Sequence, residues 1–216
     1  MKVYFISGLG ADRRVFSYIQ LPEHCHPIFL DWLKPGPKES LETYAMKMAG
    51  SIDTAEPFAL VGLSIGGMMV SEIAKIYPPL ITVLISSVPV YSQLPPYFKM
   101  AAGVRLHKLI PPFIYQSASM TLRFFSPESA EIKALLIQIV RESDPDFIRW
   151  GIQAVPEWKN QRLPDPYVHI HGTNDIVLPI RYTKPTHVIQ GAGHLLVMNN
   201  AASVNTILKD VFSKYI

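Results

Sequence analysis

Cysteine is almost absent from this sequence, which has one such residue among 216. With Cys25 alone, no disulfide can form within the chain. A chain without disulfides fits a reducing compartment. The fold must therefore be stabilised by its own hydrophobic core, and the length is sufficient for one core of ordinary size. We expect a single domain that spans residues 1–216.

Long apolar runs are also missing. The first apolar run, Val3–Ile6, is four residues long, far shorter than the apolar segment of a secretory signal. No stretch of the sequence approaches the ~18 consecutive apolar residues of a membrane-spanning helix. We therefore expect a cytoplasmic protein without a membrane span.

Charge is sparse and nearly balanced. Charged residues make up 17% of the chain, hydrophobic residues make up 49%, and the formal net charge is +3. This balance is typical of a folded globular protein. A mild positive excess without a run of lysine and arginine gives no reason to expect nucleic-acid binding.

Short apolar runs that alternate with helical patterns are the main structural signal. Runs that are apolar throughout predict strands buried on both faces, and their alternation with helices predicts an α/β fold with a parallel sheet. The expected strands are Val3–Ile6, Pro27–Leu30, Phe58–Val61, Ile81–Ile85, Tyr167–Ile170 and Thr186–Ile189. The expected helices between and after them are Leu41–Ile52, Gly66–Tyr77 and Ala202–Tyr215.

The segment Ser92–Leu163 interrupts this alternation. It contains helical patterns and no convincing strand, so we expect an inserted helical cap at about residues 92–163, between the fourth and fifth strands. The expected cap helices are Pro96–Leu109, Phe113–Phe125, Ser129–Glu142 and Asp146–Ala154. Most cap aromatics are expected to pack the cap onto the sheet, and one or two to line an apolar pocket. These aromatics are Tyr97, Phe98, Phe113, Tyr115, Phe124, Phe125, Trp150 and Trp158.

The sequence GLSIGG follows the third expected strand and opens a helix. A G-x-S-x-G at such a junction predicts a nucleophile elbow, with Ser64 on a sharp turn. Gly62 and Gly66 must lack side chains, because the chain before the turn passes close to the chain after it. Gly67 lets the helix pack tightly on neighbouring strands. The helix N-terminus favours developing negative charge, and the Ile65 N–H is a natural oxyanion donor.

Two polar segments follow the last two expected strands. Residues 171–175 read HGTND and residues 191–194 read GAGH. Parallel strands end at the same edge of a sheet, so Asp175 and His194 should lie at the edge that carries Ser64. A lone loop aspartate is usually a turn residue or a helix cap, but the order Ser, Asp, His is the order of nucleophile-elbow hydrolases. We predict Asp175 as the catalytic acid and His194 as the base.

On these three motifs the chain resembles the α/β-hydrolase superfamily, from Lys2 to the C-terminal helix. The resemblance implies a trimmed version of the fold with about six parallel strands, which starts at the third strand of the full fold. The family's motif after this first strand usually reads His-Gly, and in this chain it is Ser7 followed by Gly8 and Leu9. The resemblance implies that the Leu9 backbone N–H is the second oxyanion donor, although Ser7 replaces the usual histidine.

The implied reaction is hydrolysis of a small-molecule ester or related acyl compound. His194 takes the proton of Ser64 as the serine attacks the acyl carbonyl, and Asp175 orients the imidazole. The Leu9 and Ile65 amides receive the oxyanion, and water then releases the acyl group. The apolar cap predicts a small, largely apolar substrate.

Other interpretations stay open at this point. The fold also supports lyases and haloperoxidases on similar triads, and a non-catalytic ligand-binding protein would keep the same fold. Asp144, Asp146 and Asp165 are rivals for the acid role only if the loop after the fifth strand is misplaced. We expect no cofactor, because no P-loop or Gly-x-Gly-x-x-Gly turn occurs. We expect no metal at His24–His26, since neighbouring side chains of an extended segment point to alternate faces.

Overall fold

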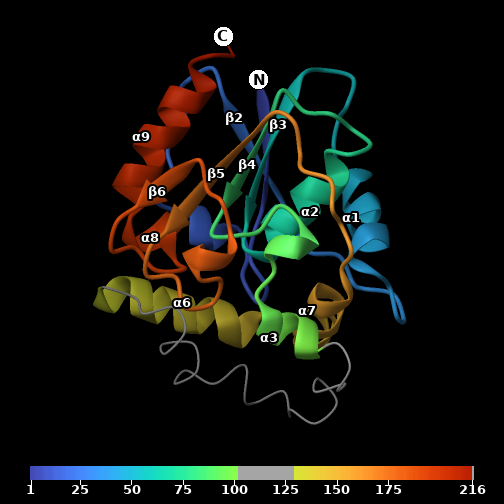
Figure 1. Ribbon diagram of the computed structural model, residues 1–216. Helices are drawn as coiled ribbons and strands as arrows, with labels where there is room; N and C mark the ends of the chain where they lie inside the picture. The colour runs from blue at the N-terminus through green and yellow to red at the C-terminus, as the bar shows by residue number, and fades with distance from the viewer. Residues whose placement is uncertain (102–128, 216) are drawn as a thin grey trace.

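A parallel sheet lies at the centre of the computed structural model, which describes residues 1–101 and 129–215 (Figure 1). The sheet has six strands in the order β2-β1-β3-β4-β5-β6, and each neighbouring pair is parallel. The strands are β1 (Lys2–Ile6), β2 (His26–Leu30), β3 (Phe58–Leu63), β4 (Ile81–Ile85), β5 (Tyr167–Gly172) and β6 (His187–Ile189). The prediction of a six-stranded parallel α/β fold is therefore confirmed.

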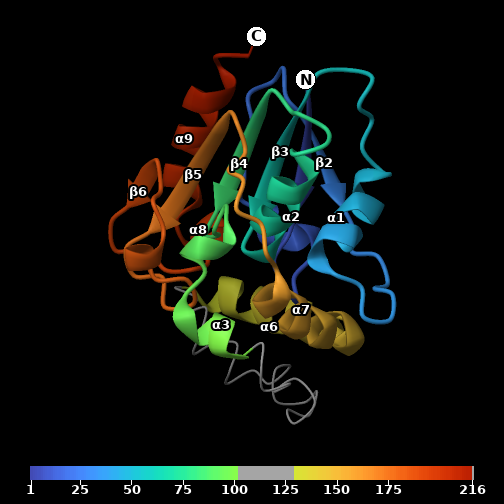
Figure 2. The ribbon, with the colours of Figure 1, turned by 45° about the vertical axis from the view of Figure 1, so that its right-hand side comes forward.

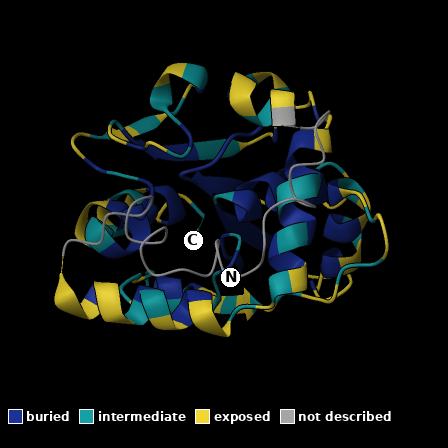
Figure 3. Cartoon of the chain, turned by 90° about the horizontal axis from the view of Figure 1, so that it is seen from below, coloured by how far each residue is buried: buried dark blue, intermediate teal, exposed yellow. Residues whose placement is uncertain are grey.

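Helices cover both faces of this sheet. Helices α1 (Leu41–Ala49) and α2 (Ile65–Ile73) lie on one face, and α8 (Leu196–Asn199) and α9 (Ala201–Phe212) lie on the other (Figures 1 and 2). Alternate residues of one strand enter different cores, because successive side chains of a strand point to opposite faces. Phe5 packs in the core that contains α9, and Tyr4 packs in the core that contains α1 and α2. Figure 3 shows the buried residues gathered in the middle of the molecule.

The three helices predicted outside the cap are shorter than the apolar periodicity predicts, whereas the one predicted at Asp146–Ala154 extends from Pro145 to Glu157. Helix α2 ends at Ile73, although the pattern continues to Tyr77. The chain after Ile73 tightens, and the Lys75 and Ile76 amides donate to carbonyls three residues earlier. Such a tightened turn satisfies carbonyls at a helix end and is a common way for a helix to stop. In the part of the chain that the structure describes, no helix has the length and apolar character needed to cross a membrane.

The segment between β4 and β5 is helical where it is described. It contains η2 (Tyr91–Gln93), α3 (Pro96–Ala101), α6 (Ala130–Glu142) and α7 (Pro145–Glu157). We call α3, α6 and α7 the cap helices; they lie across the C-terminal end of the sheet (Figures 1 and 2). The expected helix Phe113–Phe125 and the end of the expected helix Pro96–Leu109 lie outside the described residues. Two short 3₁₀ turns, η1 (Arg13–Phe16) and η4 (Ile180–Tyr182), lie elsewhere in the chain.

Candidate active site

Ser64 lies at the sharp junction between β3 and α2. Its backbone has φ 54° and ψ −120°, a region that residues with a side chain rarely adopt and that stores strain. Three hydrogen bonds hold this turn. The Ser64 N–H donates to the Ile85 carbonyl at 2.9 Å, the Gly67 N–H donates to the Ser64 carbonyl at 2.9 Å, and the Ser87 hydroxyl donates to the same carbonyl at 2.6 Å.

Glycine is required on both sides of Ser64 because backbones approach each other there. A Cβ placed on Gly62 would lie 2.3 Å from the Gly66 carbonyl oxygen, and one placed on Gly66 would lie 2.2 Å from the Ile6 carbonyl oxygen. A Cβ on Gly67 would lie 2.3 Å from the Ser87 hydroxyl oxygen. The third contact is with a side chain, whereas the first two are with main chain that cannot easily move.

The structure brings Ser64, His194 and Asp175 into one hydrogen-bonded series. The His194 Nε2 lies 3.0 Å from the Ser64 Oγ, and the His194 Nδ1 lies 2.7 Å from Asp175 Oδ2. An ionised carboxylate only accepts hydrogen bonds, so the proton of a neutral His194 is on Nδ1. Nε2 then presents a lone pair to the serine hydroxyl. This is the arrangement that a general base for Ser64 requires.

Asp175 is almost fully buried, with 3% of its surface exposed. Burial alone would raise its pKa, but the charge and hydrogen bond of His194, together with the Leu178 N–H, outweigh this effect. The pKa of Asp175 therefore lies below its ordinary range. Oδ1 accepts from the Val177 and Leu178 amides at 2.9 and 2.8 Å, which leaves Oδ2 directed at His194.

The loops that carry Asp175 and His194 are bonded to each other. The Asn174 N–H donates to the Ala192 carbonyl at 2.9 Å, and the Gly191 N–H donates to the Thr173 hydroxyl at 2.8 Å. These bonds hold the chain after β5 beside the chain after β6. The distance between the acid and the histidine is thus set by hydrogen bonds of the main chain and of the Thr173 hydroxyl.

Two buried histidines of β5 lie behind Asp175. The His171 Nε2 is 2.7 Å from the Leu178 carbonyl oxygen and 3.4 Å from Asp175 Oδ2, and its Nδ1 is 3.2 Å from the His169 Nε2. The Leu178 carbonyl requires a proton on His171 Nε2, so Nδ1 of a neutral His171 accepts from His169. Burial lowers the pKa of His171, and burial and the nearby His171 lower the pKa of His169 to about 3. In the sequence, the only sign of this histidine pair is the run HIHG at residues 169–172, before the loop that carries Asp175.

The loop after β1 runs beside Ser64. A Cβ placed on Gly8 would lie 3.5 Å from the Ser64 Cβ. The Ser7 hydroxyl and the Trp32 indole N–H both donate to the Ala11 carbonyl at 2.8 Å, which braces this loop. Within residues 1–101 and 129–215, neither the Leu9 N–H nor the Ile65 N–H donates a hydrogen bond. An oxyanion donor needs an N–H of this kind.

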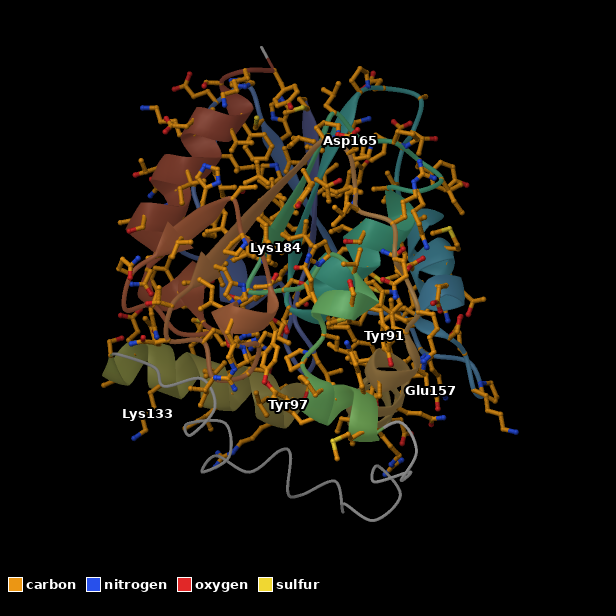
Figure 4. All side chains as sticks on the ribbon, viewed as in Figure 1. Tyr91, Tyr97, Lys133, Glu157, Asp165 and Lys184 are labelled. Carbon is orange, nitrogen blue, oxygen red and sulfur yellow. The ribbon has the colours of Figure 1, made fainter. Side chains whose placement is uncertain are left out.

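A cavity of about 240 Å³ lies over Ser64. Phe98, Leu136, Val140 and Val155 of the cap helices line it, with Leu9 and other apolar residues of the sheet loops. Among its described lining residues, none is Asp, Glu, Lys or Arg. Of the cap aromatics predicted from the sequence, Phe98 lines the cavity, whereas Trp150 and Trp158 are buried in the core. Tyr97 (Figure 4) donates a hydrogen bond to the Val177 carbonyl, near Asp175. Phe113, Tyr115, Phe124 and Phe125 lie outside the described residues.

The three aspartates considered as alternatives for the acid role, Asp144, Asp146 and Asp165, lie elsewhere in the structure. Asp165 lies at the opposite end of the sheet from the cap helices (Figure 4). Asp144 caps α7 by accepting from the Asp146 N–H at 2.8 Å, and Asp146 forms an ion pair with Arg149 at 2.6 Å. Within the described ranges, no group of three His, Cys, Asp or Glu side chains is placed to hold a metal ion.

A profile of the α/β hydrolase family matches residues 3–206, so the chain belongs to this family. A thermophilic esterase from Thermogutta terrifontis has a similar structure, with 17% identity, a TM-score of 0.73, and coverage of 99% of this chain and 90% of that one. A lipase-esterase related protein from Clostridium acetobutylicum has 18% identity and a TM-score of 0.73, with coverage of 97% of this chain and 93% of that one. An enol-lactonase from Burkholderia xenovorans has 14% identity and a TM-score of 0.77, with coverage of 98% of this chain and 91% of that one. Identities this low establish the shared fold, and no curated protein sequence matches the chain significantly.

Replacement of Gly66 tests the main-chain contact at the elbow. We expect Gly66→Ala to lower the free energy of unfolding by about 3 kcal/mol or more, because the new methyl meets main-chain atoms of β1 and the loop after it. The matched control is Gly193→Ala, because a Cβ at Gly193 meets no atom within 4 Å. The control should change stability by no more than about 0.5 kcal/mol. Urea denaturation measures both, and equal effects would contradict the role of Gly66.

The buried histidines predict a loss of stability in acid. In the unfolded chain a histidine has a pKa of about 6.5, whereas His169 in the fold has one of about 3. Below pH ~6.5 the unfolded state therefore binds more protons, and the free energy of unfolding falls as the pH falls toward 3.

We expect His169→Gln to make this pH dependence shallower, by at most about 1.4 kcal/mol per pH unit. The exposed His26→Gln serves as the control and should keep the wild-type slope. Denaturant unfolding of the three proteins between pH 4 and 7 measures the difference. Equal slopes for the wild type and His169→Gln would show that His169 is not held neutral.

Proposed function

We propose that the protein is a serine hydrolase that cleaves a small, largely apolar ester through an acyl-enzyme on Ser64. The observation that carries the proposal is the hydrogen-bonded series from Ser64 through His194 to Asp175, at the floor of an apolar cavity. Membership of the α/β hydrolase family supports hydrolysis as the general reaction. In this proposal residues 1–216 form one domain, and the cap at about residues 92–163 forms the roof of the pocket.

Acylation begins when the Ser64 Oγ forms a bond to the acyl carbon. The hydroxyl proton passes to the His194 Nε2, which lies 3.0 Å away. The carbonyl π electrons move to oxygen, and the Leu9 and Ile65 amides donate hydrogen bonds to it. When the carbonyl re-forms, the bond to the leaving alkoxide breaks, and this oxygen takes the proton from Nε2. Asp175 stabilises the positive charge that His194 carries between the two transfers.

Deacylation repeats the sequence with water as the nucleophile. The His194 Nε2 takes a proton from water while the oxygen of that water bonds to the acyl carbon. Collapse of the second tetrahedral intermediate breaks the bond to the Ser64 Oγ, which recovers its proton from His194. The products are a carboxylic acid and the alcohol released earlier, and the free enzyme is restored.

The apolar lining of the cavity favours substrates whose acyl group is uncharged. A charged group would lose its hydration on entry and find no described side chain of opposite charge that replaces the lost interactions. Neutral apolar groups gain from the same transfer. Lyase and haloperoxidase reactions on similar triads are distinguished from this proposal by measured ester turnover. A pure ligand-binding protein is less compatible with the strained turn at Ser64, because binding alone needs no strained serine.

Replacement of the nucleophile is the most direct test. We expect Ser64→Ala to fold and to lose turnover of an activated short-chain ester by about 10³-fold or more. A fluorophosphonate probe should label the wild-type protein on Ser64 and leave Ser64→Ala unlabelled. Folded protein without labelling, or a variant with more than about a tenth of wild-type activity, would overturn the assignment.

The acid is tested by removal of its charge. Asp175→Asn should lower turnover by about 10⁴-fold, because an amide N–H directed at Nδ1 favours the wrong tautomer of His194. Asp146→Asn is the matched control, because Asp146 pairs with Arg149 on the outside of α7. Its turnover should be close to that of the wild type. A larger effect of Asp146→Asn than of Asp175→Asn would show that the acid is misassigned.

A further inference from the structure

The side chain of Leu9 fills a notch in helix α7. A Cβ placed on Gly151 would lie 2.3 Å from Leu9 Cδ1, 3.2 Å from Cδ2 and 3.3 Å from Cγ. Gly151 is buried in the middle of the helix, where glycine costs about 1 kcal/mol relative to alanine. Any side chain at this position would therefore have to displace the end of the Leu9 side chain.

The next residue of the same loop also contacts α7. Gly10 has φ +70°, and a Cβ placed on it would lie 3.3 Å from Ile148 Cδ1. Ile148 and Gly151 are three positions apart, so they share one face of the helix. This face of α7 thus touches two consecutive residues of the loop that bears the Leu9 N–H.

Helix α7 is itself anchored to the core. The Trp150 indole N–H donates to the Glu39 carbonyl at 2.7 Å, and the Trp158 indole N–H donates to the Glu72 carboxylate at 2.7 Å. The rings of Phe147 and Trp32 are 4.4 Å apart. These contacts tie both ends of α7 to the side of the sheet that α1 and α2 cover (Figure 2). The face of α7 that contacts Leu9 therefore has a fixed position relative to Ser64, which directly precedes α2.

We propose that Gly151 is a positioning residue for the oxyanion site, through which the anchored helix α7 holds the Leu9 N–H at its place beside Ser64. This inference rests on the proposed function, since it presumes that the Leu9 N–H binds the oxyanion. An oxyanion donor acts only when it lies at hydrogen-bond distance from the developing charge. Displacement of Leu9 by α7 should consequently affect the transition state more than the bound substrate.

Gly151→Ala, Leu9→Ala and the double variant test this proposal on an activated ester that the wild-type protein hydrolyses. The methyl of Gly151→Ala pushes Leu9 away, so we expect kcat to fall by about tenfold or more while KM changes little. In the double variant the shorter side chain of Leu9→Ala leaves room for the methyl. Its kcat should equal that of Leu9→Ala alone, which is the signature of direct coupling between the two sites.

Gln153→Ala, two positions along α7, is the matched control and should keep the wild-type kcat. Thermal unfolding of each variant shows that the assays are made on folded protein. If Gly151→Ala does not fold, the double variant still provides the comparison with Leu9→Ala, and a kcat well below that of Leu9→Ala overturns the proposal. It is also overturned if folded Gly151→Ala keeps the wild-type kcat, or if its loss persists in the double variant.

The same experiment separates the two levels of inference. Wild-type protein that neither hydrolyses the ester nor reacts with a fluorophosphonate at Ser64 would remove the proposed function, and this inference with it. Wild-type protein that does both, together with a Gly151→Ala variant of unchanged kcat, would remove only the role of Gly151. A steric role limited to stability would lower the melting temperature and leave kcat unchanged at temperatures well below it.

Discussion

The close approach of three backbone segments at Ser64 is the constraint on which the rest of the site depends. The end of β3, the start of α2 and the end of β1 meet there with no room for side chains at Gly62 and Gly66. This approach turns the chain so sharply that Ser64 adopts a strained conformation. It also brings the Ile65 N–H and the loop after β1 to the same place, so the nucleophile and both candidate oxyanion donors share one structural cause.

Much of this arrangement follows from local sequence and from chain order. The run Val3–Ile6 and its counterparts predict strands because they are apolar throughout, and parallel pairing places all their C-terminal ends at one edge. Ser64, Asp175 and His194 each come directly after such a strand, or within a few residues of it. Their meeting is therefore predictable without knowledge of any side-chain contact, since topology alone brings them together.

Other features were not predictable, because they depend on partners far away in the chain. The role of Ser7 is one example, because only the structure shows that its hydroxyl shares the Ala11 carbonyl with the Trp32 indole. Gly151 in isolation is a residue that weakens a helix, and its partner Leu9 lies at the other end of the sequence.

The two sides of the site are held by different means. The loops after β5 and β6, which carry the acid and the base, are bonded to each other through main-chain groups and the Thr173 hydroxyl. Tyr97 of α3 also donates to the Val177 carbonyl in the first of these loops. The oxyanion side instead contacts α7, a helix of the cap that also contributes Val155 to the cavity. A change in the cap that reshapes the pocket therefore also acts on the loop of Leu9. Under the proposed function, one helix links the pocket lining to the loop that bears the Leu9 N–H, and Gly151 is where the two meet.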